Sequence, residues 1–344
     1  MSSETAQRLT LRSIAAEVGV SVSTVSKVLN GRPGVGSATR DQVRRVVERH
    51  HYRRGGRLPG TTVVDLVLNE VDSLWSAEII TGVEDVLNAA GVTMTLTALH
   101  GTPTDTGKWL ARPADRRADG AVLVVADLRP RQRLRLASLG LPVVLIDPAG
   151  SEDTGVPTVG TTNWAGAVAA TEHLIGLGHR RIAHVAGPPG LLSSRARADG
   201  FRVAMERSGL PVPDGWTHAA VFNEAAGHAA AGRLFGTAHR PAPAVPTAVF
   251  AASDQQAFGV YRALRDRGLR VPEDVSVVGF DDVPATRWSD PGLTTVRQPL
   301  REMAATGART LLRLIDGTAT GPRRVDLATR LVVRHSTAAP GTSV

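Results

Sequence analysis

The 344-residue sequence contains no cysteine, and only two of its 40 basic residues are lysines, Lys27 and Lys108. The missing thiols exclude disulfide bonds, cysteine-ligated zinc, iron–sulfur clusters and cysteine nucleophiles. No stretch approaches the ~20 uninterrupted apolar residues that a membrane-spanning helix needs, so we expect no membrane partner. The first residues, MSSETAQR, lack the apolar run of a signal peptide. A cytoplasmic protein is therefore expected.

Motifs of catalysis are missing as well. The sequence has no G-x-S-x-G nucleophile elbow, no H-E-x-x-H zinc pair and no G-x-x-x-x-G-K-[ST] phosphate loop. Its ten histidines are scattered. The adjacent carboxylates Asp281 and Asp282 follow a predicted strand, where neighbouring side chains point apart. We expect no catalytic residue, no metal site and no cofactor.

Residues 11–31, LRSIAAEVGVSVSTVSKVLNG, predict two short helices joined by a tight turn. Apolar residues recur at helical spacing on both sides of Gly19, and Ser21 can cap the second helix. Val25 and Val28 should face inward. The opposite face of the second helix carries small donors, one cation and an amide, which suit base edges in the DNA major groove. An ordinary helical hairpin with a solvated polar face would show the same pattern.

Charge favours the DNA-binding interpretation. Residues 1–60 hold eleven basic and four acidic side chains, a net charge of +7, while the other 284 residues hold 29 basic and 28 acidic ones, net +1. A third helix is predicted from Ser37 to His50, and its exterior is rich in arginine. This distribution is typical of a nucleic-acid-binding head on a nearly neutral body.

From Thr62 onward, strands and helices alternate. Strands are predicted at 62–68, 92–97, 120–125, 142–147, 181–187, 247–252, 275–280 and 294–299, with a last strand near 323–334; helices are predicted at 77–90, 163–178, 194–209, 254–268 and 300–317. Such alternation is typical of parallel sheets covered on both faces. The two series predict an α/β body of two doubly wound lobes.

Ligands of open α/β sheets bind beyond the carboxyl ends of the strands. Polar or aromatic residues follow several predicted strands: Asn69, Glu70, Asp72, Ser73, Trp75, Asp147, Ser253, Asp254, Asp281 and Asp282. Carboxylates accept hydroxyl hydrogen bonds and an indole stacks on a sugar ring, so a polyhydroxylated ligand would suit this crevice. Two alternatives remain open: Asp254 can cap the helix that follows it, and Trp75 can belong to the core.

The run T-L-R-S-I-A-A-E-V-G-V-S-V-S-T-V-S-K-V-L-N-G resembles the signature of the lactose/galactose repressor family of bacterial transcriptional regulators. Later blocks resemble the same family, among them V-G-T-T-N-W-A-G-A, S-R-A-R-A-D-G-F, F-A-A-S-D-Q-Q-A-F-G, V-S-V-V-G-F-D-D and P-G-L-T-T-V-R-Q-P. The resemblance implies a helix-turn-helix head and a body like periplasmic sugar-binding proteins, with two lobes, three crossovers and a ligand in the cleft. It also implies a homodimer.

Helix geometry, position after predicted strands and the resemblance together indicate roles for particular residues. The predicted DNA-binding set is Thr10, Ser21, Val22, Ser23, Thr24, Ser26, Lys27, Asn30, Arg57 and Leu58; the predicted effector-binding set is Trp75, Arg197, Phe222, Ser253, Asp254 and Asp281. Family members insert a leucine from a short hinge helix into the minor groove, and Leu58 is the candidate. Here the linker is shorter, and its glycines disfavour a helix.

We therefore expect a three-helix head at residues 1–52 and a linker at 53–61. The first lobe should comprise 62–161 and 293–323, and the second 162–292 and 324–340. The predicted function is a ligand-responsive transcriptional regulator, most plainly a repressor that binds a near-palindromic double-stranded operator and a small molecule such as a sugar. A transport-type sugar-binding protein and a sugar-modifying enzyme with an appended DNA-binding head are the alternatives.

Overall fold

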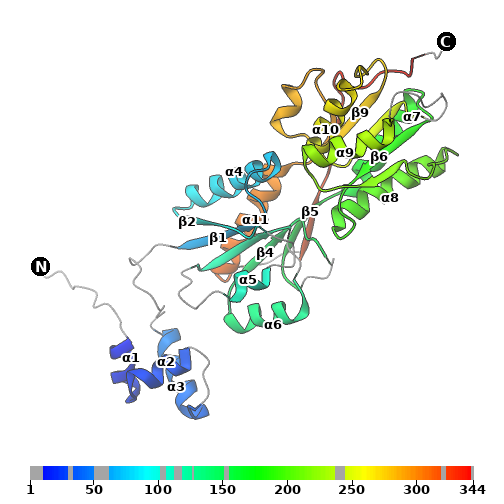
Figure 1. The fold of residues 1–344 in the computed structure, drawn as a ribbon. Coiled ribbons are helices and arrows are strands. Elements are labelled where there is room, and N and C mark those ends of the chain that lie inside the picture. The colour runs from blue at the N-terminus through cyan, green and yellow to red at the C-terminus, as the bar shows by residue number, and fades with distance from the viewer. Residues whose placement is uncertain are drawn as a thin grey trace, which may run out of the picture. The chain divides into compact units, whose positions relative to one another are not determined.

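The computed structural model describes residues 11–29, 34–49, 62–100, 106–111, 118–125, 128–150, 155–236, 245–318 and 323–341. Its residues fall into two compact units, a head of three helices and a body that begins at Thr62 (Figure 1). Part of the predicted DNA-binding set lies outside the described residues: Thr10, Asn30, Arg57 and Leu58. The linker 53–61 lies outside them too.

The head consists of α1 (Leu11–Val18), α2 (Val22–Leu29) and α3 (Ser37–Arg49). Gly19 follows α1 with φ +72°, a conformation that glycine adopts without strain. Ser21 Oγ then accepts the backbone N–H of Thr24 at 3.1 Å and caps α2. The core of the head is formed by Ile14, Ala15, Val18, Val25, Val28, Val43 and Val46. The predicted turn and cap are confirmed.

The first lobe is built on a six-stranded sheet in the order β11-β5-β4-β3-β1-β2, and all its neighbours pair in parallel. Its strands are β1 (Val63–Leu68), β2 (Thr93–Ala98), β3 (Gly120–Val124), β4 (Val143–Ile146), β5 (Thr158–Thr161) and β11 (Arg324–Leu327). Its helices are α4 (Leu74–Ala89), α5 (Thr106–Ala111), α6 (Pro130–Leu139) and α11 (Leu300–Ile315).

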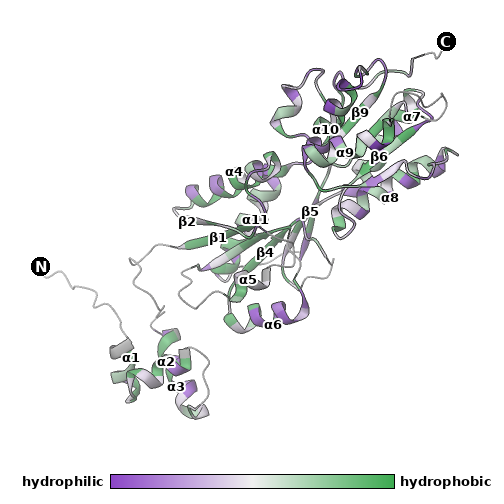
Figure 2. Ribbon diagram, viewed as in Figure 1, coloured by the Kyte–Doolittle hydropathy of each residue, from purple (hydrophilic) through white to green (hydrophobic). Residues whose placement is uncertain are grey.

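Alternate residues of these strands enter two separate cores. Leu66 and Val122 pack in the cluster that includes α4 and α11 residues, whereas Val67 and Leu123 pack with Trp109 of α5 on the other face. This alternation follows from the two-residue period of a strand, and it explains why the central strands β3 and β4 are apolar throughout. Figure 2 shows the hydrophobic strands inside and hydrophilic residues on outer helices such as α6.

The second lobe repeats this plan with the strand order β12-β10-β9-β8-β6-β7, in which only β12 runs antiparallel to its neighbour. The strands are β6 (Ile182–Ala186), β7 (Thr217–Ala219), β8 (Ala248–Ala251), β9 (Ser276–Asp281), β10 (Thr294–Arg297) and β12 (Arg330–Val332). The helices are α7 (Asn163–Gly176), α8 (Leu192–Arg207), α9 (Glu224–Phe235) and α10 (Asp254–Arg265). A 3-10 turn, η2 (Pro284–Arg287), follows β9.

Two glycines bring α9 and α10 into backbone contact. A Cβ atom at Gly227 would lie 2.2 Å from the carbonyl oxygen of Gln256, and one at Gly259 would lie 2.1 Å from the carbonyl oxygen of Glu224. Both distances are far inside van der Waals contact, so only glycine fits at either position. The close approach fixes α10, whose first turn faces the carboxyl ends of the strands.

The chain passes between the lobes three times: from β5 to α7, from β10 to α11 and from β11 to β12. The expected lobe boundaries need correction at two of these passages. Strand β10, at 294–297, belongs to the second sheet and not to the first, and β11, at 324–327, belongs to the first and not to the second. The predicted single strand at 323–334 is in fact two strands, one in each sheet. No described helix is long and apolar enough to cross a membrane.

Candidate DNA-binding face and effector cleft

The outward face of α2 presents a small mixed surface. Ser23 and Lys27 are exposed, and Val22 keeps 40% of its surface exposed although it is apolar. Thr24 is half-buried, and its hydroxyl lies 2.8 Å from Ser21 Oγ, so it takes part in the cap. A donor, a cation and a methyl-bearing side chain on one helix face match the hydrogen-bonding groups and thymine methyls of the major groove.

The third helix adds positive charge to the head. Arg44 and Arg45 are exposed, in agreement with the arginine-rich exterior that the sequence predicts for this helix. Arg49 forms an ion pair within the head. Its guanidinium lies 3.2 Å from the carboxylate of Glu17, and the pair links α3 to α1. Exposed ion pairs of this kind contribute little to stability.

The carboxyl ends of the strands are the strained part of the body. Among the described residues, five that are not glycine have a positive φ: His100, Val125, Asp147, Asp281 and Asp282. Each of them ends or follows β2, β3, β4 or β9. Backbone strain costs free energy and gathers at sites where geometry serves function. Its concentration here marks the crevice that the sheet topology predicts.

Arg197 lies in this crevice on α8 and is only 3% exposed. Its Nε donates to Asn163 Oδ1 at 2.8 Å, and its Nη1 donates to the carbonyl oxygen of Ala252. Its guanidinium carbon lies 3.8 Å from the ring centroid of Phe280, a cation–π contact. Burial lowers the pKa of Arg197, and the nearby carboxylate of Asp281 opposes this shift.

Asp281 is the partner of Arg197. Its Oδ1 lies 3.6 Å from Arg197 Nη1 and accepts a hydrogen bond from Gln298 Nε2 at 2.6 Å. Burial raises the pKa of Asp281 to about 6, although Arg197 and Gln298 stabilise the ionised form. Asp147, at the end of β4, also interacts electrostatically with Arg197. Burial raises the pKa of Asp147 as well. The structure therefore brings Arg197, Asp281 and Asp147 together in one buried polar cluster.

Asp282 and Asp254 have partners away from this cluster. Asp282 is bound by Arg297 and Arg334, so the adjacent carboxylates do diverge. Asp254 is fully buried; its Oδ2 accepts the backbone N–H of Val283 at 2.9 Å and its Oδ1 accepts the hydroxyl of Thr295. Both oxygens are thus occupied within the second lobe, where Asp254 stabilises strand ends. Its predicted effector contact stays a prediction.

Ser253 and Trp75 also have local roles. Ser253 Oγ accepts the backbone N–H of Gln256 at 3.2 Å and caps α10, directly after the carbonyl that receives Arg197. Trp75 is half-buried against the core cluster of the first lobe, a cluster that also includes Val283 of the second lobe. The core interpretation of Trp75 thus fits its packing.

A hollow of about 460 Å³ lies at the rim of the crevice and is lined from both lobes. The lining residues are Glu70, Asp72, Ser73, His100, Phe222, Asn223 and Gln255. Phe222 joins this rim to the buried cluster, since its ring centroid lies 5.6 Å from the Arg197 guanidinium carbon. Beside the ring, Ser194 Oγ is buried and has no hydrogen-bond partner in the described part of the chain.

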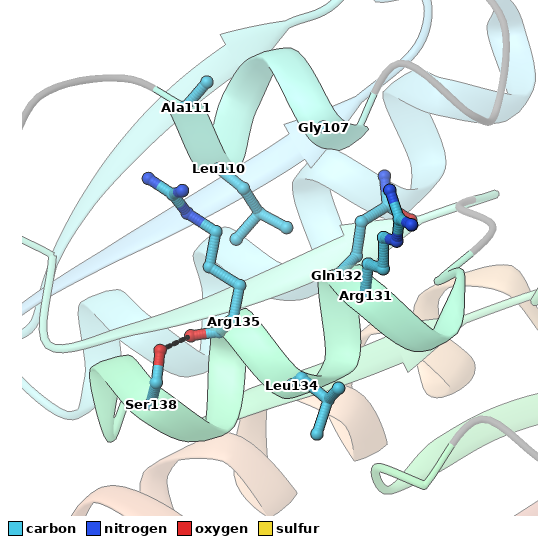
Figure 3. A pocket seen from close by; sticks show the side chains of 8 residues that line it. All are labelled: Gly107, Leu110, Ala111, Arg131, Gln132, Leu134, Arg135 and Ser138. Carbon is cyan, nitrogen blue, oxygen red and sulfur yellow. Dashed lines mark hydrogen bonds between the residues drawn. The ribbon is translucent and has the colours of Figure 1, made fainter.

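A second hollow, of about 480 Å³, lies between α5 and α6 in the first lobe (Figure 3). Exposed side chains of Arg131, Leu134 and Arg135 surround it, and Leu134 is 71% exposed. In contrast to the crevice, none of the residues that line this hollow has a positive φ, and none is a buried charged residue. We therefore assign the candidate effector site to the crevice.

Sequence reasoning missed Asn163 and Gln298, which hold Arg197 and Asp281. Both stand in the blocks that carry the family resemblance, which is the signal that could have found them. Asn163 follows β5, a strand that the sequence did not predict, and Gln298 lies inside the predicted strand 294–299. Among the described residues, no group of three or more histidines and carboxylates could hold a metal ion.

A helix-turn-helix head on a two-lobed body with a polar interlobe crevice defines the class of DNA-binding transcriptional regulators. Residues 10–55 match the family model of bacterial regulatory proteins of the lacI family, and residues 171–337 match a periplasmic binding protein-like domain. The transcriptional regulator MalR of Streptomyces coelicolor is 35% identical to this sequence over 96% of the chain and 97% of its own length. The chain belongs to the lacI family of bacterial regulatory proteins.

Other relatives agree with this assignment. The transcriptional repressor PurR of Yersinia pestis is 30% identical over 96% of this chain and 97% of its own length. Among solved structures, a transcriptional regulator CelR in complex with cellobiose has a TM-score of 0.71 and 34% identity, covering 96% of this chain and all of its own. A Lac repressor dimer bound to operator has a TM-score of 0.71 and 25% identity over 97% of this chain and all of its own.

Proposed function

We propose that this protein is a cytoplasmic, homodimeric repressor that binds a near-palindromic operator, and that a carbohydrate in the interlobe crevice sets its operator affinity. The observation that carries the proposal is the buried Arg197–Asp281 pair, which lies among strained strand ends in a chain that also has a helix-turn-helix head. Buried charges and strain of this kind cost stability and are typical of functional sites.

A carbohydrate suits the crevice chemically. Ionised carboxylates accept hydrogen bonds from vicinal hydroxyls, Arg197 donates them, and the Phe222 ring offers a face for the apolar side of a pyranose. The rim adds further carboxylates from Glu70 and Asp72 on the opposite lobe. Because the rim continues from the buried cluster through Phe222, we propose a disaccharide or longer ligand. The cellobiose complex of the related CelR supports this choice.

On the head, we propose that Val22, Ser23 and Lys27 contact bases and that Arg44 and Arg45 contact phosphates. Phosphate contacts supply affinity without sequence preference, while contacts to base edges specify the site. A homodimer would place two such heads on two half-sites. Trp288, which is 78% exposed, is a side chain that an interface between two copies would cover.

A thermal-shift screen of monosaccharides and disaccharides on the full chain tests the effector. A ligand at 100 times its Kd should stabilise the folded protein by about 2.7 kcal/mol and raise Tm measurably. The variants Arg197→Ala and Asp281→Asn should lose this shift, while the exposed control Asp199→Asn should keep it. If no carbohydrate raises Tm, the proposed ligand class is wrong; a normal shift in both cleft variants would place the site elsewhere.

Binding to promoter DNA tests the regulator against its alternatives. A transport-type protein has no need for sequence-specific DNA binding, whereas a repressor should select one near-palindromic site from random duplexes. A sugar-modifying enzyme with an appended DNA-binding head would also bind DNA, and a nucleotide-binding assay separates that enzyme from the repressor. Its affinity should also fall steeply with salt as phosphate contacts are screened. Failure to select any site would exclude the repressor.

A further inference from the structure

Asn163 and Gln298, which bind Arg197 and Asp281, lie on segments through which the chain passes from one lobe to the other. Asn163 begins α7, directly after the passage from β5, and Gln298 stands between β10 and α11. They are 8% and 3% exposed, respectively. Neither belongs to the residues for which we proposed effector contacts.

Hydrogen bonds and one ion pair join these residues in a closed ring of five. Asn163 Oδ1 accepts Arg197 Nε at 2.8 Å, Arg197 Nη1 lies 3.6 Å from Asp281 Oδ1, and Gln298 Nε2 donates to that same oxygen at 2.6 Å. Gln298 Oε1 accepts the hydroxyl of Thr161 at 2.7 Å. Asn163 Nδ2 donates to the carbonyl oxygen of Thr161 at 3.4 Å and closes the ring.

The third passage is attached to the first. Thr162 donates its backbone N–H to the carbonyl oxygen of Leu327 at 3.0 Å, and the N–H of Thr329 donates to the Thr162 hydroxyl at 2.9 Å. The Thr329 hydroxyl also donates to the Thr162 carbonyl at 3.1 Å. All three passages are therefore connected, directly or through one neighbour, to the ring that contains Arg197 and Asp281.

We propose that Gln298 and Asn163 are positioning residues that transmit the state of Arg197 and Asp281 to the interlobe passages. The amide of Gln298 is planar and both of its ends are bonded, so its oxygen cannot keep its place on Thr161 when its nitrogen leaves Asp281. A ligand hydroxyl that displaces Gln298 Nε2 from Asp281 Oδ1 would therefore disturb the end of β5. The effector role of Arg197 and Asp281 in this proposal rests on the proposed function.

Hydrogen exchange of the full chain, without effector or operator, tests the ring. The reporters are one backbone amide in each passage, Thr162, Gln298 and Thr329. Asp281→Asn removes the charge in the ring and should speed exchange of all three about fivefold, the factor expected for one net hydrogen bond. In a Gln298→Leu background the same change can act only through Arg197 and Asn163, so the acceleration that it adds should be smaller. An equal acceleration in both backgrounds would refute transmission through Gln298.

A matched pair at Thr161 provides a second test that does not depend on Gln298→Leu folding. Thr161→Val keeps the shape of the side chain but removes its hydroxyl, and it should speed exchange at the Gln298 amide; Thr161→Ser keeps the hydroxyl and should restore slow exchange. Thr171→Val removes another buried hydroxyl, one bonded to the Ala167 carbonyl outside the ring, and serves as the control for general destabilisation.

Equal behaviour of all three threonine variants would overturn the proposal. The measurement needs neither carbohydrate nor DNA. Equal exchange in all variants would therefore refute transmission through the ring without contradicting the proposed regulator. Conversely, failure of the carbohydrate screen would refute the ligand class and leave the ring intact.

Discussion

Because of Asp281, the body should be more stable at mildly acidic pH than at neutral pH. Burial raises the pKa of Asp281 from 3.8 to about 6, so the folded state binds this proton more tightly than the unfolded chain does. The resulting stabilisation is fully present below pH ~4 and is lost as the pH rises through about 6. Because one pKa unit corresponds to about 1.4 kcal/mol, lowering the pH from 7 to 5 should add about 1 kcal/mol to the free energy of unfolding.

For a body of this size, that contribution corresponds to about 2 °C in Tm. The assay compares the Tm change between pH 7 and pH 5 in the wild-type chain, in Asp281→Asn and in the exposed control Asp199→Asn. Burial also raises the pKa of Asp147 and Asp254, and the negative charge of Asp281 adds to the shift of Asp254. The difference between the wild type and Asp281→Asn therefore reports Asp281 together with its effect on Asp254. An identical pH response in the wild type and Asp281→Asn, or a wild type that loses stability toward pH 5 relative to that variant, would refute the reasoning.

Three further predictions concern other parts of the chain. Lys27→Ala should weaken operator binding by about 1–3 kcal/mol per head and relax specificity at one position of each half-site, as measured by binding to a library of single-base operator variants; a uniform loss over all sequences would show a phosphate contact instead. Gly259→Ala should lower Tm strongly because its Cβ has no room, whereas Gly176→Ala, which meets no atom within 4 Å, should leave Tm nearly unchanged. Trp109→Phe should cost about 1–3 kcal/mol in urea unfolding, because it removes the indole N–H that donates to the buried Asp65 carboxylate at 2.7 Å.

The sequence predicted elements whose signal is local. Strands β3 and β4 are continuous apolar runs, β1 and β6 are apolar runs with one polar residue each, and the head has a turn glycine and a capping serine in sequence. Strand β5 was missed because T-V-G-T has no hydrophobic pattern of its own and becomes a strand through pairing with β4 and β11 on either side. The division of residues 323–334 between two sheets was missed for the same reason, since nothing local marks the change of lobe.

The candidate site shows a similar limit. Resemblance and position after a strand indicated Arg197 and Asp281, which the structure brings within 3.6 Å. They also indicated Asp254, but whether a carboxylate at a strand end faces a ligand or a neighbouring backbone depends on tertiary partners such as the Val283 N–H. Gln298 was missed because its role depends on two residues far away in sequence, Thr161 and Asp281.

The three passages also constrain the order in which the protein can fold during synthesis. The first lobe begins at β1, yet its sheet lacks an edge until β11, at 324–327, has been made, and α11 covers the sheet only after residue 315. At about 5–20 residues per second, the ribosome needs roughly 8–33 s to extend the chain from the end of β5 to the end of β11. The second lobe's central strands are complete earlier. Its edge strand β12, at 330–332, is nevertheless made after β11. Both sheets are therefore completed only by the last residues of the chain, and the exposed β5 edge of the first lobe needs protection in the meantime.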